Sequence, residues 1–229
     1  MRLTLLRHAT LVVEFAGMRL LVDPMLGPAR VALPRQAGEA LAGLDGVWVS
    51  QVAADHCDGE ALSWMPADVG VWGPEPVAGW LRSAGLERAQ AITKFSTVGG
   101  AQLIPVPAAQ RGGSAALVLR GRGEPTVLVA GDRPADPALV TALRHYRPDV
   151  VALSGGGAAG GAGFEATLTA ECMIPLFKIV PEATFIVTHL EALGGGAESR
   201  AAAKAAFDAA GVLYQAAIPA DGETVRLTA

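Results

Sequence analysis

Apolar strands that end in an acid or a histidine alternate with amphipathic helices along the second half of this chain. Residues 126–132 read TVLVAGD and precede a helical stretch, PALVTALRHYR. Residues 183–191 read ATFIVTHLE and precede an alanine-rich helical stretch at 198–211. A strand at residues 149–154 and a helix at residues 167–180 fit the same scheme. Strands that alternate with helices predict an α/β fold in which the helices pack outside the sheets.

The first half of the chain predicts the same layers and opens with a β-hairpin. LTLLRH, TLVVEF and RLLVDP are rich in apolar and β-branched residues, and Ala16-Gly17-Met18 separates the last two as a turn. A loop rich in proline and glycine follows, and then the short apolar strand DGVWVS at residues 45–50. Helices are expected at residues 60–66 and 77–85, and strands at residues 69–73 and around Ala91, Gln102 and Ala116.

Length and charge limit the number of domains and the class of partner. With 229 residues, of which 51% are hydrophobic and 17% charged, the chain is expected to form one domain spanning residues 1–229. Its net charge is −4 and its 18 Lys and Arg are scattered singly. This argues against nucleic acid and membranes as partners and favours a small-molecule substrate. Assembly into a homo-oligomer is left open.

The sequence also indicates a location for the protein. Arg7, His8 and Glu14 interrupt the apolar N-terminal stretch, which is therefore expected to be part of the fold and not a signal peptide. No uncharged apolar run approaches the roughly 18 residues that a membrane-spanning helix needs. Two cysteines in a chain of this length do not form a disulfide framework. A cytoplasmic, bacterial-type setting is expected.

Four metal-binding residue types stand at the ends of three expected strands. Asp55 and His56 follow the strand at 45–50, Asp132 ends the strand at 126–132, and His189 lies near the end of the stretch at 183–191. Carboxylates and imidazoles are acceptable ligands for divalent metals, and strand ends meet at a common rim. Taken singly, each has a structural interpretation, because such an acid often caps a helix and a buried histidine often only completes a core.

The order of these residues resembles that of the metallo-β-lactamase fold superfamily, and in particular its subgroup of small metal-dependent hydrolases similar to the ascorbate-phosphate lactonase. The resemblance spans nearly the whole chain. It implies a four-layer αββα sandwich with a metal site along one edge of the two sheets. The segments that carry the resemblance are RHATLVVEFAGMRLLVDPML, VWVSQVAADHCD, VLVAGDRPAD, RPDVVALSGGGA, VTHLEAL and IPADGETVRL.

The chain departs from the signature that the family carries after its second-quarter strand, Thr/Ser-His-x-His-x-Asp-His. Aligned on Asp55 and His56, the two earlier histidines fall on Gln51 and Ala53, and a third family histidine, from a later loop, falls on Gln110. The resemblance implies that these three would have held a first metal. The ligands that it assigns to the second metal are all present: Asp55, His56, Asp132 and His189.

The retained half predicts a hydrolase with one divalent metal (Zn, Mn or Fe) or none. Asp55 and Asp132 are the expected catalytic residues, and the expected substrates are an ester, lactone, amide or phosphoester. Gln51 and Gln110 are poor zinc ligands but can hydrogen-bond a substrate oxygen. His8 matches an early histidine of the family, so it contacts either the substrate or the surrounding structure.

Neighbouring residues are assigned supporting or structural roles. Asp23 resembles the family acid that holds the signature loop through hydrogen bonds, and Asp58 is expected to bind a backbone amide. Cys57 is expected to pack as a small hydrophobe, and His145 to be inert on its helix. The four tryptophans are expected to serve packing, with Trp64 and Trp72 as candidates to border a pocket.

Two other functions stay open. The first is a catalytically inactive relative that keeps the fold as a small-molecule binding or interaction module. In that protein the acids would pair with Arg133, Arg111 or the histidines, since buried charges need partners. The second is a nucleotide-binding α/β protein, because the glycine cluster at residues 154–163 formally matches a dinucleotide fingerprint.

Overall fold

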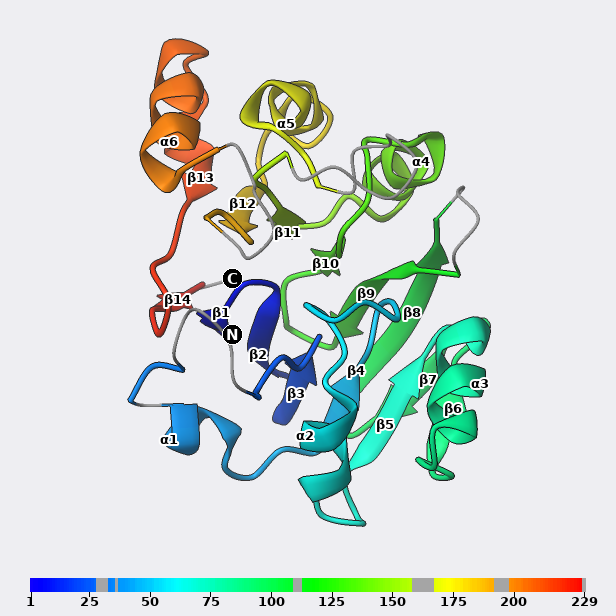
Figure 1. The fold of residues 1–229 in the computed structure, drawn as a ribbon. Helices are drawn as coiled ribbons and strands as arrows, with labels where there is room; N and C mark the ends of the chain where they lie inside the picture. The colour runs from blue at the N-terminus through cyan, green and yellow to red at the C-terminus, as the bar shows by residue number, and fades with distance from the viewer. Residues whose placement is uncertain (28–32, 36, 109–112, 158–166, 192–197, 228–229) are drawn as a thin grey trace.

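Two seven-stranded sheets form the centre of the molecule in the computed structural model (Figure 1). The structure describes residues 1–27, 33–35, 37–108, 113–157, 167–191 and 198–227. One sheet has the strand order β14-β1-β2-β3-β4-β5-β6, and the other has the order β13-β12-β11-β10-β9-β8-β7. Each sheet is mixed, with an antiparallel part and a parallel part.

The first sheet is built mainly from the N-terminal half. β1, β2 and β3 pair antiparallel, which confirms the expected hairpin, and β3 to β6 pair parallel. The turn between β2 and β3 places Ala16 and Gly17 at φ of 51° and 77°. The strands are β1 (Arg2–Arg7), β2 (Thr10–Phe15), β3 (Met18–Val22), β4 (Gly46–Trp48), β5 (Gly70–Gly73), β6 (Ala89–Ala91) and β14 (Thr224–Arg226).

The second sheet is antiparallel from β7 to β10 and parallel from β10 to β13. Its central strands are wholly buried and rich in Val, Leu and Ile, as parallel strands covered on both faces are. The strands are β7 (Ser96–Val98), β8 (Ala101–Pro107), β9 (Ala115–Gly121), β10 (Val127–Val129), β11 (Val150–Ser154), β12 (Thr184–Thr188) and β13 (Ala216–Ala217).

Helices cover the outer face of each sheet. Apolar side chains of α1 to α3 pack on the first sheet, and those of α4 to α6 pack on the second. Among the described helices, none has both the length and the apolar character needed to cross a membrane. The helices are α1 (Ala37–Leu41), α2 (Gly59–Trp64), α3 (Glu75–Ser83), α4 (Pro137–Tyr146), α5 (Ala170–Phe177) and α6 (Arg200–Ala209), with a 3₁₀ turn at Leu213–Gln215.

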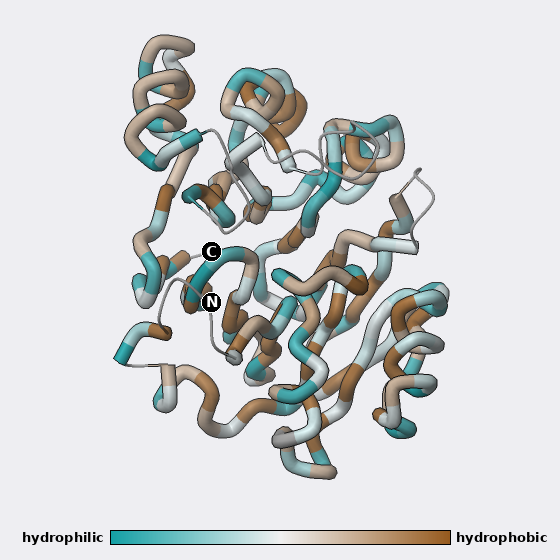
Figure 2. Tube along the Cα trace, viewed as in Figure 1, coloured by the Kyte–Doolittle hydropathy of each residue, from teal (hydrophilic) through white to brown (hydrophobic). Residues whose placement is uncertain are grey.

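A third apolar cluster fills the space between the two sheets. It contains Leu5 and Phe15 from the first sheet and Leu117 and Ile186 from the second, each at most 1% exposed. Figure 2 shows the corresponding hydrophobic stretches along the central strands. The expected four-layer αββα sandwich is therefore confirmed.

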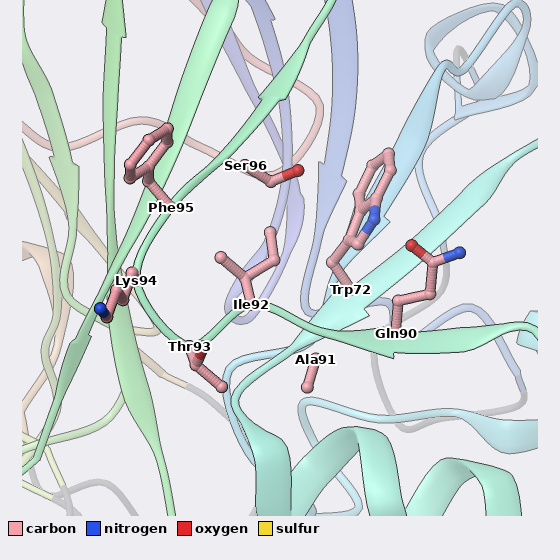
Figure 3. A pocket seen from close by; sticks show the side chains of 8 residues that line it. All are labelled: Trp72, Gln90, Ala91, Ile92, Thr93, Lys94, Phe95 and Ser96. Atoms are coloured by element: carbon pink, nitrogen blue, oxygen red, sulfur yellow. The ribbon is translucent and has the colours of Figure 1, made fainter.

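The aromatic residue Trp72 takes a structural position in the first sheet. Its ring lies across β4 and β5, where a Cβ on Gly46 or Gly70 would approach ring atoms to 2.0 and 2.3 Å, so both positions require glycine. Trp72 also borders a pocket of about 340 Å³ with residues of the β6–β7 segment, among them Ile92 and Phe95 (Figure 3). No lining residue of this pocket belongs to the predicted metal ligands.

The loops that follow five strands bring polar residues to one edge of the sandwich. His8 follows β1, Asp23 follows β3, Ser50 follows β4, Asp132 follows β10 and His189 follows β12. Three of these residues, His8, Asp23 and His189, adopt left-handed backbone conformations with φ of 51°, 48° and 62°. Non-glycine residues seldom adopt this conformation, and those that do concentrate at functional sites.

Candidate metal centre

Asp55, His56, Asp132 and His189 come together although 134 positions separate the first from the last. One ligand atom from each lies within 4.8 Å of the others. His56 Nε2 lies 2.8 Å from Asp132 Oδ2, and His189 Nε2 lies 3.3 Å from Asp55 Oδ2. The His56 and His189 rings stack with their centroids 5.6 Å apart. The sequence therefore identified a group of side chains that converge on one point.

Asp23 fixes the orientation of His56 from behind. Its carboxylate lies 2.8 Å from His56 Nδ1 and accepts hydrogen bonds from the Ser50 amide at 2.7 Å and the Ser50 hydroxyl at 2.8 Å. All three residues are buried. A hydrogen bond from Nδ1–H to the carboxylate leaves the Nε2 lone pair of a neutral imidazole facing the cluster, which is the arrangement that metal-binding histidines use.

Ser50 was not singled out as a functional residue from the sequence, although it occupies the first position of the family signature. It links three parts of the site. Its amide and hydroxyl bind Asp23, its carbonyl accepts the Ala115 amide at 3.1 Å, and its hydroxyl lies 3.1 Å from where a Cβ on Gly131 would be. Gly131, with φ of 67°, thus lets the chain pass close to Ser50 before it reaches Asp132.

Several buried polar atoms of the cluster have no hydrogen-bond partner. They are His56 Nε2, Asp132 Oδ1 and His189 Nδ1. The 2.8 Å contact between His56 and Asp132 has the distance but not the angles of a hydrogen bond. Unpaired buried polar atoms are costly, and a metal ion bound among these side chains would give His56 Nε2 the partner that it lacks. The residues fit a divalent ion with carboxylate and imidazole ligands.

The charges of the cluster are strongly coupled. Burial alone would lower the pKa of His56, but the carboxylates of Asp132 and Asp23 outweigh burial and raise it well above the usual value. Burial raises the pKa of Asp55, but the hydrogen bond from His189 and the charges of His56 and His189 bring it down to about 2. Burial likewise opposes ionisation of Asp132, whose pKa is nevertheless lowered, chiefly by His56.

His8 lies beside the cluster but outside the four-residue group. Its ring centroid is 6.1 Å from that of His189, its Nε2 is buried without a partner, and its carbonyl accepts the His189 amide at 3.0 Å. Burial, together with the charges of His189 and Arg7, lowers the pKa of His8. His8 is therefore a neutral imidazole that can donate or accept one hydrogen bond at the site.

Asp58 joins the loop that carries Asp55 and His56 to the segment after β3, because its carboxylate binds backbone amides. Its carboxylate accepts the Gly27 amide at 2.6 Å and caps α2 through the Ala61 amide at 3.1 Å. A Cβ on Gly27 would lie 2.7 Å from that carboxylate, so glycine allows the close approach. Arg7 donates hydrogen bonds to the carbonyls of Met25 and Gly27. Asp58 and Arg7 therefore both hold the segment that follows β3.

The other predicted residues divide between this edge and elsewhere. Gln51 and Ala53 are partly buried in the loop between β4 and α2, and Cys57 is partly buried against the apolar cluster under α2. His145 lies on α4, with its ring edge-on to Tyr146. Gln110, Arg111 and most of the glycine cluster lie outside the described residues.

Arg133 does not pair with Asp132. Its guanidinium forms two 2.7 Å hydrogen bonds to Asp136, which also caps α4 through the Leu139 amide, and one to the Val106 carbonyl at 3.2 Å. Of the partners left open for Asp132 in a metal-free protein, Arg133 is therefore excluded. A carboxylate three residues further on, at the start of a helix, offers the planar guanidinium a two-point contact.

Comparison with known proteins finds similar chains that match nearly the whole length of this one. No family model matches the chain. UPF0173 protein YddR of Bacillus subtilis (strain 168) is 24% identical over 251 residues, which cover 98% of this chain and 99% of that protein. The crystal structure of isothiocyanate hydrolase from Delia radicum gut bacteria matches with a TM-score of 0.89 and 28% identity over 100% of both chains.

Two further solved structures have the same arrangement of elements. A possible metal-dependent hydrolase from Veillonella parvula DSM 2008 matches with a TM-score of 0.91 at 21% identity over 99% of both chains. The metallo-β-lactamase fold protein YhfI from Bacillus subtilis matches with a TM-score of 0.72 at 14% identity, over 98% of this chain and 99% of that one. The chain therefore has the metallo-β-lactamase fold, the fold of YhfI.

Proposed function

We propose that this protein is a metal-dependent hydrolase that works with a single divalent ion. The observation that carries the proposal is the group of two carboxylates and two imidazoles whose ligand atoms lie within 4.8 Å of one another, together with the buried His56 Nε2, which has no hydrogen-bond partner. Asp55, His56, Asp132 and His189 would hold the ion. The likeness to an isothiocyanate hydrolase and to a possible metal-dependent hydrolase supports the same class of activity.

The histidine count supports one ion rather than two. The whole chain contains four histidines. His56 and His189 are in the ligand group, His8 lies beside it, and His145 lies on α4 against Tyr146. The positions expected to hold a first metal carry Gln51, Ala53 and Gln110, and neutral amides and a methyl group compete poorly for zinc. A second ion would therefore lack the three imidazole ligands that the resemblance assigns to it.

The residues around the ion would have different roles in hydrolysis. A bound divalent ion supplies Lewis acidity, which polarises a carbonyl or phosphoryl oxygen and lowers the pKa of water. Asp23 keeps His56 in the ligand tautomer, and Asp132 supplies buried negative charge. Asp55 is the most exposed of the four, with 31% of its side chain accessible, so it is the carboxylate that solvent water reaches most readily.

His8 and Gln51 are the proposed substrate contacts. His8 has a buried Nε2 without a partner next to the cluster, so a substrate oxygen or nitrogen can complete its hydrogen bonding. Gln51 follows Ser50 in the loop after β4. It occupies the position where the family carries its first histidine. Both side chains are neutral, which favours a substrate that presents polar atoms over one that needs a cationic clamp.

Activity assays on metal-loaded protein test the proposal. The substrate panel contains an isothiocyanate, a lactone, a simple ester, an amide and a phosphoester. We expect chelated protein to be inactive, and hydrolysis of at least one substrate to return with Zn, Mn or Fe(II) and to saturate at one equivalent. Saturation only at two equivalents would contradict the single-ion proposal, and activity that survives chelation would contradict metal dependence.

A catalytically inactive binding module is the second candidate. It is favoured by a contact that the cluster makes without an ion, the hydrogen bond from His189 to Asp55 at 3.3 Å. Such a protein would bind a small molecule at the same edge and leave it intact. Binding of panel members without turnover by metal-loaded protein would support this candidate.

Metal affinity is expected to rise with pH. In the metal-free protein the raised pKa of His56 keeps both ring nitrogens protonated at neutral pH. A metal must displace the Nε2 proton to reach the nitrogen lone pair. Below the pKa of His56, loss of one proton predicts about a tenfold gain in apparent affinity per pH unit. Asp55, with a pKa of about 2, adds nothing to this slope above pH 4. Calorimetric titration in buffers of different ionisation enthalpy measures the released proton; a pH-independent affinity would contradict the expectation.

A further inference from the structure

We propose that Arg200 is the positioning residue that sets the place of His189 at the site. The inference rests on the proposed function, because it takes His189 to be a metal ligand. Arg200 is the first residue of α6 and lies eleven positions after His189 in the sequence. Its described hydrogen bonds go to none of the four ligands but to two other segments, one at Glu191 and one at Pro219–Asp221.

Each of the three guanidinium nitrogens of Arg200 donates one hydrogen bond to these two segments. Nη1 binds Glu191 Oε2 at 2.6 Å, Nη2 binds Asp221 Oδ1 at 2.6 Å, and Nε binds the Pro219 carbonyl at 3.1 Å. The Arg200 backbone amide also donates to Glu191 Oε1 at 3.0 Å. A planar guanidinium that binds two carboxylates and a carbonyl holds their relative positions more strictly than a single point charge does.

The first segment carries His189 in an unfavourable backbone conformation. His189 and Glu191 have φ of 62° and 61°, so two of three consecutive residues are left-handed without being glycine. Such conformations persist only when the surroundings hold them. Among the described residues, Arg200 stabilises this turn on the C-terminal side of His189. Its amide and its guanidinium both bind the Glu191 carboxylate.

The second segment leads to β1 and therefore to His8. Beyond Asp221, the Gly222 amide binds the Leu5 carbonyl at 2.7 Å, and the Leu5 amide binds the Glu223 carbonyl at 3.0 Å. β1 ends just before His8, whose carbonyl accepts the His189 amide at 3.0 Å. Arg200 thus joins the His189 turn to the segment at Pro219–Asp221. That segment continues into the residues that bind β1, the strand before His8. Its guanidinium fixes the backbones of two site histidines relative to each other.

The arrangement predicts a local effect and not a global one. The side chains of Arg200, Asp221 and Glu191 are 27%, 25% and 48% exposed, and ion pairs this exposed contribute little to overall stability. The Arg200→Ala variant is therefore expected to fold. It keeps the backbone amide contact to Glu191 and loses the three side-chain contacts.

The experiment compares Arg200→Ala and Arg200→Lys with a matched control, Arg82→Ala. Arg82 also binds a carboxylate, Glu75 at 3.0 Å, and a carbonyl, that of Ala89 at 3.1 Å, with 39% of its side chain exposed, but it ties α3 to β6. The first readout is the exchange rate of the His189 amide hydrogen in chelated protein. The second is the dissociation constant of Zn.

We expect faster His189 amide exchange and about tenfold weaker Zn binding in Arg200→Ala, the scale seen when groups that orient a ligand are removed. Arg200→Lys is expected to restore part of both, and Arg82→Ala to change neither. Unchanged amide exchange in Arg200→Ala would overturn the inference whether or not the protein binds metal. Faster exchange in a protein that binds no Zn would keep the positioning role and reject the proposed function instead.

Discussion

Replacing Asp132 by alanine is expected to abolish stoichiometric metal binding and to lower hydrolysis by about a thousandfold. Asp132 is the proposed ligand whose Oδ2 lies near both imidazoles, 2.8 Å from His56 and 3.7 Å from His189. Its removal leaves Asp55 as the remaining carboxylate and takes away a buried negative charge that draws a cation to the site. The activity loss corresponds to the several kcal/mol that a Lewis acid contributes to such a reaction.

The measurement is metal content together with turnover of the best substrate in the panel. Asp149→Ala is the control, because the Asp149 carboxylate accepts the Thr126 amide at 2.7 Å just before β11, at the end of that strand away from the cluster. The control should keep both metal and activity. An Asp132→Ala protein that retains one equivalent of metal and wild-type turnover would contradict the ligand assignment.

Replacing Asp23 by alanine is expected to lower the free energy of unfolding by about 3–5 kcal/mol in the metal-free protein. The Asp23 carboxylate serves the Ser50 amide, the Ser50 hydroxyl and His56 Nδ1, all within 2.8 Å and all buried. Without it these groups have no acceptor in a site that water does not reach. Breaking a buried, charged hydrogen-bond network has a cost of this size.

Urea unfolding of chelated protein measures the loss, and Ser50→Ala is the graded comparison. That variant removes one of the three hydrogen bonds to Asp23 and keeps the ionic contact with His56, so about 1 kcal/mol is expected. An Asp23→Ala protein no less stable than Ser50→Ala would show that the network does not hold the loop.

The sequence predicted the layers and the ligand group because both depend on short local patterns. Short apolar strands rich in β-branched residues, with an acid or a histidine within three residues of the strand end, identified β10 and β12 and the candidate ligands that follow them. The predicted helix at 167–180 was too long at both ends. Thr169 caps it through the Cys172 amide, so α5 starts at Ala170, and it ends at Phe177.

What the sequence did not predict depends on contacts between distant residues. β7 and β13 have three and two residues, too few for an alternating pattern to emerge. The left-handed conformations of His8, Asp23 and His189 are imposed by tertiary packing and not by their residue types. Ser50 and Arg200 act through partners 27 and 21 positions away, a relation that no local pattern encodes.

The measurement that tests the central claim most directly is the metal stoichiometry of the purified protein. Protein is stripped with chelator, incubated separately with Zn, Mn and Fe(II), desalted and analysed for metal by elemental mass spectrometry. We predict close to one equivalent of bound metal in the wild type and close to none in Asp132→Ala. Two equivalents in the wild type, or no metal under any condition, would contradict a single-ion site built from Asp55, His56, Asp132 and His189.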